Sequence, residues 1–510
     1  MSLLLLGLAA ALPLLPLIAG LLALLGTSRA PRLVWAATLA AAVIAFATTA
    51  AVLVYGTAWV RLMPDSGLSA ISLRLDAISL VMVLLVTSLG SAILRFSLHY
   101  LAGDPRQNQF FGWMGLTLSA VLTLVLSGNL LLILLAWIAT SLCLHQLLLF
   151  YPERPGAVFA ARKKFVVSRL GDLCLLGAVI LIYRHYGTWE LESLFRLVAA
   201  GDNQPLPSVG VLLVLCASLK SALFPFHSWL PDTMETPTPV SAFMHAGIIN
   251  AGGFLLIRLN PLLAHSASGL AVLSIMAAIT AAFGATVMLA QPTVKRALAY
   301  STIAQMGFML LQCGLGAFGL ALLHIVAHSL YKAHAFLHAG STIGARSPAA
   351  IRLSVPTLSF GVLAGAILVS GCATLWAKFA PGGSETSIVF LLILSLALAY
   401  GLARLGSSDA GIRSLTKGVL FAAVLVLISL GLHAAATALV PPTPAWDPSP
   451  WVSSLVGAIF IGLFLFQALL WRSRNWPLGR RLYVHALNGF YVGTWANRAL
   501  NRLWPRATSL

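Results

Sequence analysis

The residues best suited to chemistry lie in the stretch 220–245, KSALFPFHSWLPDTMETPTPVSAFMH. It places Lys220 deep in an apolar run, interrupts that run with Pro225 and Pro231, and resumes it with His245. A lysine inside lipid is costly and is therefore a functional candidate by default. Desolvation disfavours the charged ammonium, so Lys220 can exchange a proton near neutral pH. The alternative is a structural lysine paired with a carboxylate of another helix.

Prolines that break a membrane helix free backbone groups, which persist at membrane depth only where protein or water satisfies them. A broken helix with a lysine, followed by a helix with a histidine, therefore predicts a half-channel for protons or small cations. Asp232 is the first carboxylate after Lys220 and is a further candidate.

A second polar group is the run His324, His328 and Lys332, with spacing i, i+4 and i+8. At about 100° per residue these side chains form one stripe on a helix, with His338 at its edge. A single histidine on an apolar face is usually a satisfied core residue, but packing does not explain several beside a lysine. Neutral imidazole both donates and accepts protons, so the stripe favours a relay. Metal binding is the weaker alternative, because no carboxylate or thiolate joins the cluster.

Arg169 and Asp172 are spaced i, i+3 and can pair on one helix face. A structural ion pair and a role in tuning Lys220 are both open. Asp76 is a lone acid at the start of an apolar run, and the sequence assigns it no partner.

The elements that must position these residues are membrane helices. The chain has 510 residues, of which 59% are hydrophobic and only 9% charged, so it is a polytopic membrane protein in a lipid bilayer. Roughly fifteen apolar runs are long enough to span. The fold class is therefore all-α, a single bundle of about fifteen helices. The net charge of +18 follows membrane topology and does not indicate nucleic-acid binding. The five cysteines form no CxxC pair and favour neither a metal site nor disulfides.

Basic residues gather in alternate loops, including the segments 29–32, 95–106 and 154–164. The positive-inside rule then puts the N-terminus outside and the C-terminus in the cytoplasm. The first 25 residues lack a basic n-region and are interpreted as a membrane helix rather than a cleaved signal. Residues 474–510 contain no spanning run and are rich in Arg, Trp and Tyr, which suits either an interfacial helix or a partner-docking segment.

Four sequence segments resemble a known superfamily. They are SALFPFHSWLPDTMETPTPVSAFMHAG (221–247), VKRALAYSTIAQMGFM (294–309), HIVAHSLYKAHAFLHAGSTI (324–343) and FVVSRLGDLCLLG (165–177). They are similar to the proton-translocating, antiporter-like subunits of respiratory complex I and of Mrp-type sodium/proton antiporters. The resemblance implies inverted repeats with broken helices, and a central polar axis at Lys220, His245, His324, His328 and Lys332.

From the runs and this resemblance we expect five segments. They are N-terminal transmembrane helices (1–109), a first antiporter-like repeat (110–258), a second repeat (269–405), C-terminal transmembrane helices (416–473) and a basic cytoplasmic or interfacial tail (474–510).

Two positions depart from the superfamily pattern. The superfamily usually carries a glutamate directly after a tryptophan in its fifth helix, but here Ile138 follows Trp137. The second repeat should carry a lysine on a broken helix, and Lys378 is the one candidate for it.

The basic tail, the length and the lost glutamate resemble DabB, the membrane subunit family of the DAB inorganic-carbon accumulation system. That resemblance implies a non-enzymatic, multi-pass subunit of the bacterial inner membrane. It would couple entry of H⁺ or Na⁺ to one-way hydration of CO₂ to bicarbonate by DabA, a peripheral zinc protein related to carbonic anhydrases. The zinc would belong to that partner, and this chain would hold no cofactor. The alternatives are a proton-pumping subunit of a NADH-quinone oxidoreductase and an Mrp-type Na⁺/H⁺ antiporter subunit.

Overall fold

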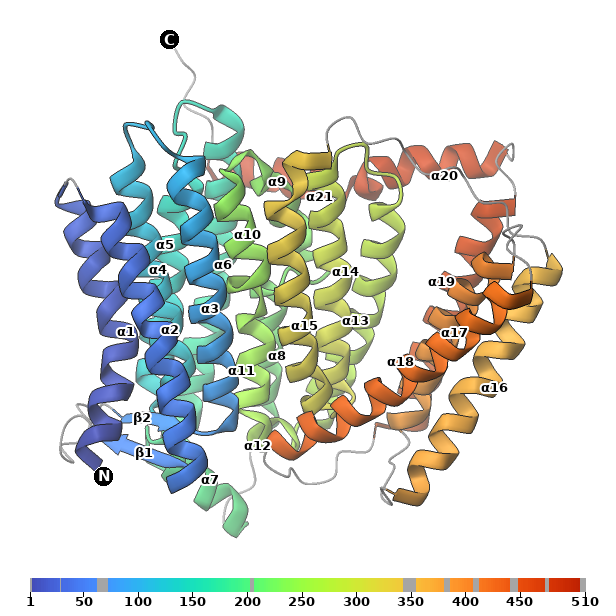
Figure 1. Cartoon of the computed structure of the whole chain (residues 1–510), viewed down its shortest axis with the longest axis horizontal. Coiled ribbons are helices and arrows are strands. Elements are labelled where there is room, and N and C mark those ends of the chain that lie inside the picture. Colours follow the sequence, from blue (N-terminus) through green and yellow to red (C-terminus); the bar gives the residue numbers. More distant parts are fainter. Residues whose placement is uncertain are drawn as a thin grey trace.

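The computed structural model describes residues 2–27, 29–61, 72–201, 206–342, 355–379, 386–406, 412–440, 448–472 and 477–504. Helices dominate these ranges and run mostly side by side between two faces (Figure 1). The face that holds α9, α20 and α21 is here called the tail face, and the opposite one, with β1, β2, α7 and α12, the hairpin face. The predicted polytopic helical bundle is thereby confirmed.

The N-terminal part precedes the first helix break. Its helices are α1 (Ser2–Leu24), α2 (Ala30–Tyr55), α3 (Ala77–Tyr100), α4 (Gln107–Leu126), α5 (Leu130–Leu148), α6 (Pro155–Tyr186), α7 (Leu191–Ala200) and α8 (Pro207–Lys220). Asp76 and Asn129 begin α3 and α5 as N-caps, because each side chain accepts a hydrogen bond from the first turn. Proline stands in the first turn of α6 and α8, where a missing N–H costs nothing.

The middle of the chain alternates short and long helices. They are η2 (Phe226–Ser228), α9 (Trp229–Asp232), η3 (Thr233–Glu235), α10 (Thr238–Ala246), η4 (Ile248–Asn250), α11 (Ala251–Arg258), α12 (Asn260–Leu263), α13 (Ala267–Met288), α14 (Val294–Gly314), α15 (Phe318–Leu337) and η5 (Ala339–Thr342). Two helices are broken here: α8 after Lys220, as predicted, and α10 at Gly247.

The C-terminal part consists of α16 (Val355–Phe379), α17 (Thr386–Gly406), α18 (Ile412–Leu439), α19 (Pro450–Arg472), α20 (Pro477–Leu487), η6 (Gly489–Tyr491) and α21 (Val492–Leu503). In Figure 1, α16 to α19 form an inclined group at one side, while α20 and α21 lie across the tail face. The tail therefore packs on the bundle rather than extending from it.

All fifteen predicted apolar runs fall within helices. Among the described residues, twelve helices are long and apolar enough to cross a membrane, and two shorter apolar helices, Pro207–Lys220 and Ile388–Ala403, accompany them. The more polar α14 packs between α13 and α15 and is not among these. The count of about fifteen spans therefore stays a prediction.

Two local features differ from the expectation. A short antiparallel hairpin, β1 (Ala58–Arg61) and β2 (Ser72–Leu75), stands beside the helices, so the described chain is not purely helical. In addition, α6 begins at Pro155, so it includes most of the basic segment 154–164 that the sequence assigns to a loop. Lys163 and Lys164, interpreted above as loop charges, therefore lie within a helix, where both are buried.

Candidate ion-translocation site

Lys220 is the last residue of α8 and lies at the helix break. The chain then turns through Ala222, whose φ of 54° is left-handed, before η2 begins. Two bonds tie this turn to neighbouring helices: Ser221 Oγ donates to the Ile249 carbonyl at 2.8 Å, and the Phe224 N–H donates to Thr280 Oγ1 at 2.9 Å. The break in α8 is thus held directly against the break in α10, as the requirement for satisfied backbone groups demands.

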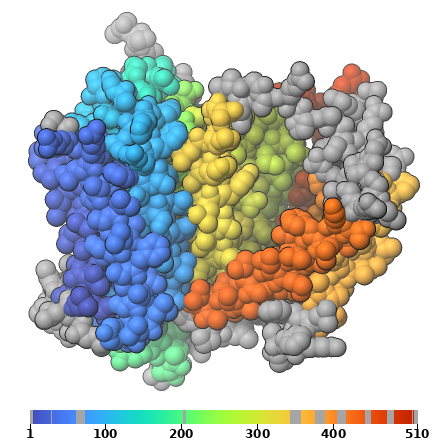
Figure 2. Space-filling model, viewed as in Figure 1, coloured from blue at the N-terminus to red at the C-terminus, as the bar shows by residue number. Residues whose placement is uncertain are grey.

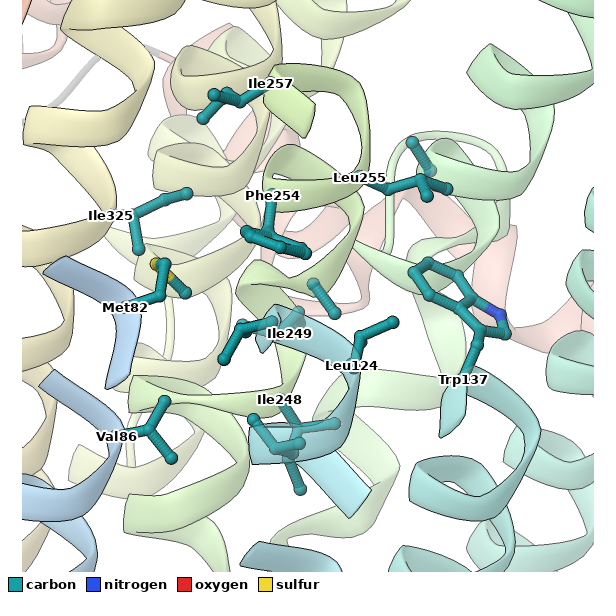
Figure 3. Packing of buried hydrophobic residues seen from close by; sticks show 14 of the residues in the cluster. Met82, Val86, Leu124, Trp137, Ile248, Ile249, Phe254, Leu255, Ile257 and Ile325 are labelled. Atoms are coloured by element: carbon teal, nitrogen blue, oxygen red, sulfur yellow. The ribbon is translucent and has the colours of Figure 1, made fainter. Parts of the chain in front are cut away.

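Close backbone contact makes this junction possible. A Cβ at Gly252, in the first turn of α11, would stand 2.7 Å from the Ala217 carbonyl oxygen of α8. Figure 3 shows apolar side chains packed around this junction, among them Ile249 of η4, Phe254 of α11 and Ile325 of α15.

The Lys220 ammonium faces an aromatic ring instead of a carboxylate. Its Nζ lies 4.5 Å from the centroid of the Trp137 ring on α5, and it has no hydrogen-bond partner among the described residues. Lys220 is 8% exposed and Trp137 1%. Ile138, which stands where the superfamily has a glutamate, packs against the hydrophobic core. A cation over an indole face is stabilised by the ring quadrupole, so Trp137 supplies part of what the missing acid would.

Arg169 and Asp172 form the predicted i, i+3 pair on α6, with Nη2 to Oδ2 at 2.7 Å. Arg169 also donates from Nη2 to Ser141 Oγ at 3.2 Å. The pair therefore adjoins the same face of α5 that Lys220 contacts, since Trp137 and Ser141 are one helical turn apart.

His245 is fully buried on α10 and belongs to a chain of polar contacts. Its Nδ1 lies 3.0 Å from Thr302 Oγ1 of α14, and the Thr302 hydroxyl donates to the Leu298 carbonyl at 3.0 Å. The same carbonyl accepts from Lys332 Nζ of α15 at 3.0 Å. Because the Thr302 hydrogen is used at Leu298, His245 Nδ1 is the donor, which leaves His245 Nε2 as the basic nitrogen. That buried nitrogen has no partner among the described residues.

His328 joins the same group from α15. Its Nε2 lies 3.2 Å from the His245 carbonyl oxygen, and its ring centroid is 5.9 Å from that of His324. The structure therefore brings together His245, His328 and Lys332, with His324 at the end of the row. Asn250 adds a further tie between the helices by donating to Ser329 Oγ at 2.8 Å.

Other candidates lie elsewhere. His338 is exposed at the tail face, where it stacks with His334 at 5.4 Å and bonds to Ser341, so it does not join the buried row. Asp232 does not pair with Lys220; its carboxylate accepts a hydrogen bond from Lys163 Nζ at 2.8 Å. The Lys378 side chain lies outside the described residues. Among the described residues, no group of three or more His, Cys, Asp or Glu gathers as a metal site.

Several contributing residues have little signal in the sequence. Thr302 stands in the motif VKRALAYSTIAQMGFM without any mark of its contact to His245. Lys164 lies in a basic segment that hides it, although a charge only eight residues from Asp172 on the same apolar helix could have indicated it. Asp76, the acid without an assignable partner, is bonded by Arg258 at 2.6 Å and Arg74 at 2.9 Å on the hairpin face.

Comparisons with known proteins agree with this architecture. The family model described as NADH:quinone oxidoreductase/Mrp antiporter, TM, matches residues 127–360, and that of the complex I chain 5 N-terminus matches residues 65–111. The chain is 39% identical to the "Probable inorganic carbon transporter subunit DabB2" of Halothiobacillus neapolitanus, over 86% of this chain and 82% of that protein. The chain belongs to the DabB family. A DabB subunit of Hydrogenovibrio crunogenus is 37% identical over 84% of this chain and 82% of its own length.

More distant relatives share part of the chain. NADH-quinone oxidoreductase subunit L of Mycobacterium tuberculosis is 38% identical, over 56% of this chain and 45% of that protein. The solved Mrp complex of Dietzia sp. DQ12-45-1b matches 98% of this DabB-family chain and 59% of its own, with a TM-score of 0.61 and 25% identity. An archaeal membrane-bound sulfane sulfur reductase matches with a TM-score of 0.60 at 19% identity, which shows the fold alone.

Proposed function

We propose that this chain is the ion-conducting membrane subunit of an inorganic-carbon transporter. Protons, with sodium as the alternative ion, would move through the buried polar axis formed by Lys220, His245, His328 and Lys332. The names of the DabB relatives support the transport class, and the linked contacts of His245, Thr302 and Lys332 support conduction. The observation that carries the proposal is the buried Lys220 ammonium, which stands at a helix break with no hydrogen-bond partner among the described residues.

The axis would work by passing protons between groups that are both donors and acceptors. Lys220 would take up the proton at the break, and the basic Nε2 of His245 would receive it next. Lys332 and the histidines of α15 would pass it on toward the other face. Each charge that crosses gains about 2.3 kcal/mol per 100 mV of membrane potential.

The ion movement would serve chemistry in another protein. A peripheral zinc partner of carbonic-anhydrase type would convert CO₂ to bicarbonate, and ion entry here would bias its conformations so that the reaction runs one way. This division places the catalytic metal in the partner. The bacterial inner membrane is the compartment in which such a gradient exists, with the tail face toward the cytoplasm.

The test begins with the tagged chain, purified from its native membrane in mild detergent, and mass spectrometry with metal analysis of what accompanies it. We expect one large soluble partner with stoichiometric zinc. Several membrane subunits with iron–sulfur and flavin proteins, or a set of small antiporter subunits, would replace the proposal with a redox pump or an antiporter.

The intact complex is then placed in liposomes with a pH-sensitive or a sodium-sensitive dye and an imposed potential. Lys220→Met should abolish ion entry and bicarbonate formation together, because it removes the titrating amine at nearly constant volume. Lys295→Met, the same change in the first turn of α14, is the control. Undiminished flux through Lys220→Met would remove Lys220 from the path.

A further inference from the structure

Lys164 is a second lysine buried beside the candidate site. It lies on α6 with 3% of its surface exposed. Its Nζ donates to the Ser141 carbonyl at 2.7 Å and to Ser141 Oγ at 2.9 Å. Both acceptors are neutral, so this contact orients the amine in either protonation state and does not neutralise its charge.

Lys164 and Lys220 border the same face of α5. Ser141 receives Lys164, and Trp137, four residues earlier, receives Lys220. One helical turn separates these two contact points by about 6 Å along the axis. The two amines therefore occupy adjacent positions in one low-dielectric region, where like charges repel strongly.

The charges around Lys164 do not balance. The groups that face it are Cys143 and His145 from α5, Arg169 and Asp172 from α6, and Lys220 from α8. Asp172 is the one carboxylate among them, and Arg169 already pairs with it at 2.7 Å. Lys163, the neighbour in sequence, is directed away to Asp232. The two lysine ammonium groups thus remain without a counter-charge. Ile138 occupies the position at which the superfamily usually has a glutamate.

We propose that Lys164 is a second proton-binding site and that it shares one proton with Lys220. When one amine is an ammonium, the other is neutral, and the proton that leaves the first is taken by the second, so the total charge of the site is unchanged. This sharing rests on the proposed ion conduction. Lys164 would thereby replace the missing glutamate of this DabB-like site. A glutamate would hold the proton on Lys220 by charge attraction, whereas Lys164 lowers the cost of its release by accepting it.

The pair predicts opposite effects for two substitutions of Lys164. In Lys164→Met, Lys220 no longer meets a competing charge, so it stays protonated to higher pH. The alkaline limit of ion flux in liposomes should move up by about one pH unit. In Lys164→Arg a permanent charge opposes protonation of Lys220, and the same limit should move down by about one unit, or flux should be lost.

Ser141→Ala provides a milder variant that keeps the lysine. It removes one acceptor from the ammonium of Lys164, which favours its neutral form. The alkaline limit should therefore shift upward, in the same direction as for Lys164→Met. Lys295→Met should keep the wild-type profile.

A structural lysine would behave differently. If Lys164 were only structural, Lys164→Arg would be tolerated and Lys164→Met would reduce the amount of assembled protein. The pH profile of the assembled protein would be unchanged in both variants. That result, or shifts of the alkaline limit in the same direction in both variants, would overturn the shared proton. The two proposals fail separately: wild-type flux in Lys220→Met refutes conduction through Lys220, whereas loss of flux there with unmoved Lys164 variants refutes only the sharing.

Discussion

Lys220 directs its ammonium at the face of Trp137, with 4.5 Å between Nζ and the ring centroid. Cation–π attraction at a desolvated site is worth about 2 kcal/mol, much less than a buried carboxylate would give. Asp172 also attracts the charge of Lys220 but is already paired with Arg169 at 2.7 Å, so the ring is the group that the ammonium contacts directly. The arrangement holds a proton weakly, as a carrier that must release it requires.

Ion flux in variants of Trp137 should therefore fall as the cation–π attraction of the replacing side chain weakens. Trp137→Phe keeps an aromatic face and should lower ion flux about threefold, whereas Trp137→Leu removes it and should lower flux by thirtyfold or about 2 kcal/mol. Flux is measured in liposomes at equal amounts of folded complex. Trp189→Leu, on the hairpin face, controls for loss of a large ring there. Equal flux for the Phe and Leu variants would show that the ring only fills space.

Thr302 should be essential to the histidine relay. Thr302→Val preserves the shape of the side chain but leaves the buried His245 Nδ1 without its partner at 3.0 Å. Loss of a buried hydrogen bond of this kind costs about 1–3 kcal/mol, so flux should fall about tenfold while assembly is retained.

The matched control for this variant is Thr117→Val. Thr117 is also buried, and its hydroxyl bonds to a carbonyl four residues earlier, at Trp113, but it lies on α4, which carries no member of the axis. If both variants reduce flux equally, the effect comes from helix stability and not from His245.

The sequence predicts the axis well where charge interrupts apolar runs. Lys220, His245 and the stripe on α15 are visible because polar groups inside lipid are rare and costly. Figure 2 shows α15 at the surface between α3 and α18. Leu330, which helical geometry places opposite His328 on α15, is exposed. The break after Lys220 follows from Pro225 and Pro231 in the same way, whereas the sequence does not predict the break at Gly247.

Other features depend on contacts that no local pattern encodes. Lys164 is indistinguishable from the neighbouring basic residues that the positive-inside rule assigns to a loop, because only tertiary packing shows that α6 begins at Pro155. Thr302 resembles any threonine that bonds back to its own helix. The partner of Asp76 is Arg258, 182 residues away, and no local pattern links the two.

The ion pair between Asp76 and Arg258 should make the stability of the folded protein fall at low pH. Burial alone would raise the pKa of Asp76, but Arg258 and Arg74 outweigh it and lower the pKa to about 2. A depressed carboxyl pKa contributes stability that is complete above about pH 4 and is lost as the pH falls toward about 2. Thermal unfolding in detergent should show this loss in the wild type.

Asp76→Asn should remove that acid dependence and destabilise the protein at pH 7 by about 3 kcal/mol, because Arg258 is left buried without its counter-charge. Asp104→Asn is the control, since Asp104 lies in the loop between α3 and α4 at the tail face. An unchanged unfolding temperature for Asp76→Asn at pH 7 would contradict the assignment.

The docking of α21 on the bundle should depend on the hydrogen bond between Lys163 and Asn497. Asn497 of α21 accepts from Lys163 Nζ at 2.6 Å, and the same ammonium donates to Asp232 and to the Ser228 carbonyl beside the break of α8. Trp504 adds contacts to Arg162 and Phe165 of α6. Asn497→Leu removes the charge-assisted hydrogen bond to Lys163, which is worth about 1.5–3 kcal/mol, so α21 should detach from the bundle more often. Trypsin cleavage after the exposed Arg498 and Arg502 should become about tenfold faster, because cleavage follows the population of the open form.

Asn488→Leu is the matched control for the tail. Asn488 is exposed, and within the part of the chain that the structure describes its side chain bonds to its own segment, at the Val484 carbonyl, at 2.8 Å. Its cleavage rate should equal that of the wild type. If Asn497→Leu is cleaved no faster than this control, the aromatic contacts of Trp504 hold α21 without the bond to Lys163. If cleavage accelerates and ion flux in liposomes falls with it, the docked tail also supports the α8 break, since Lys163 connects Asn497 to Ser228.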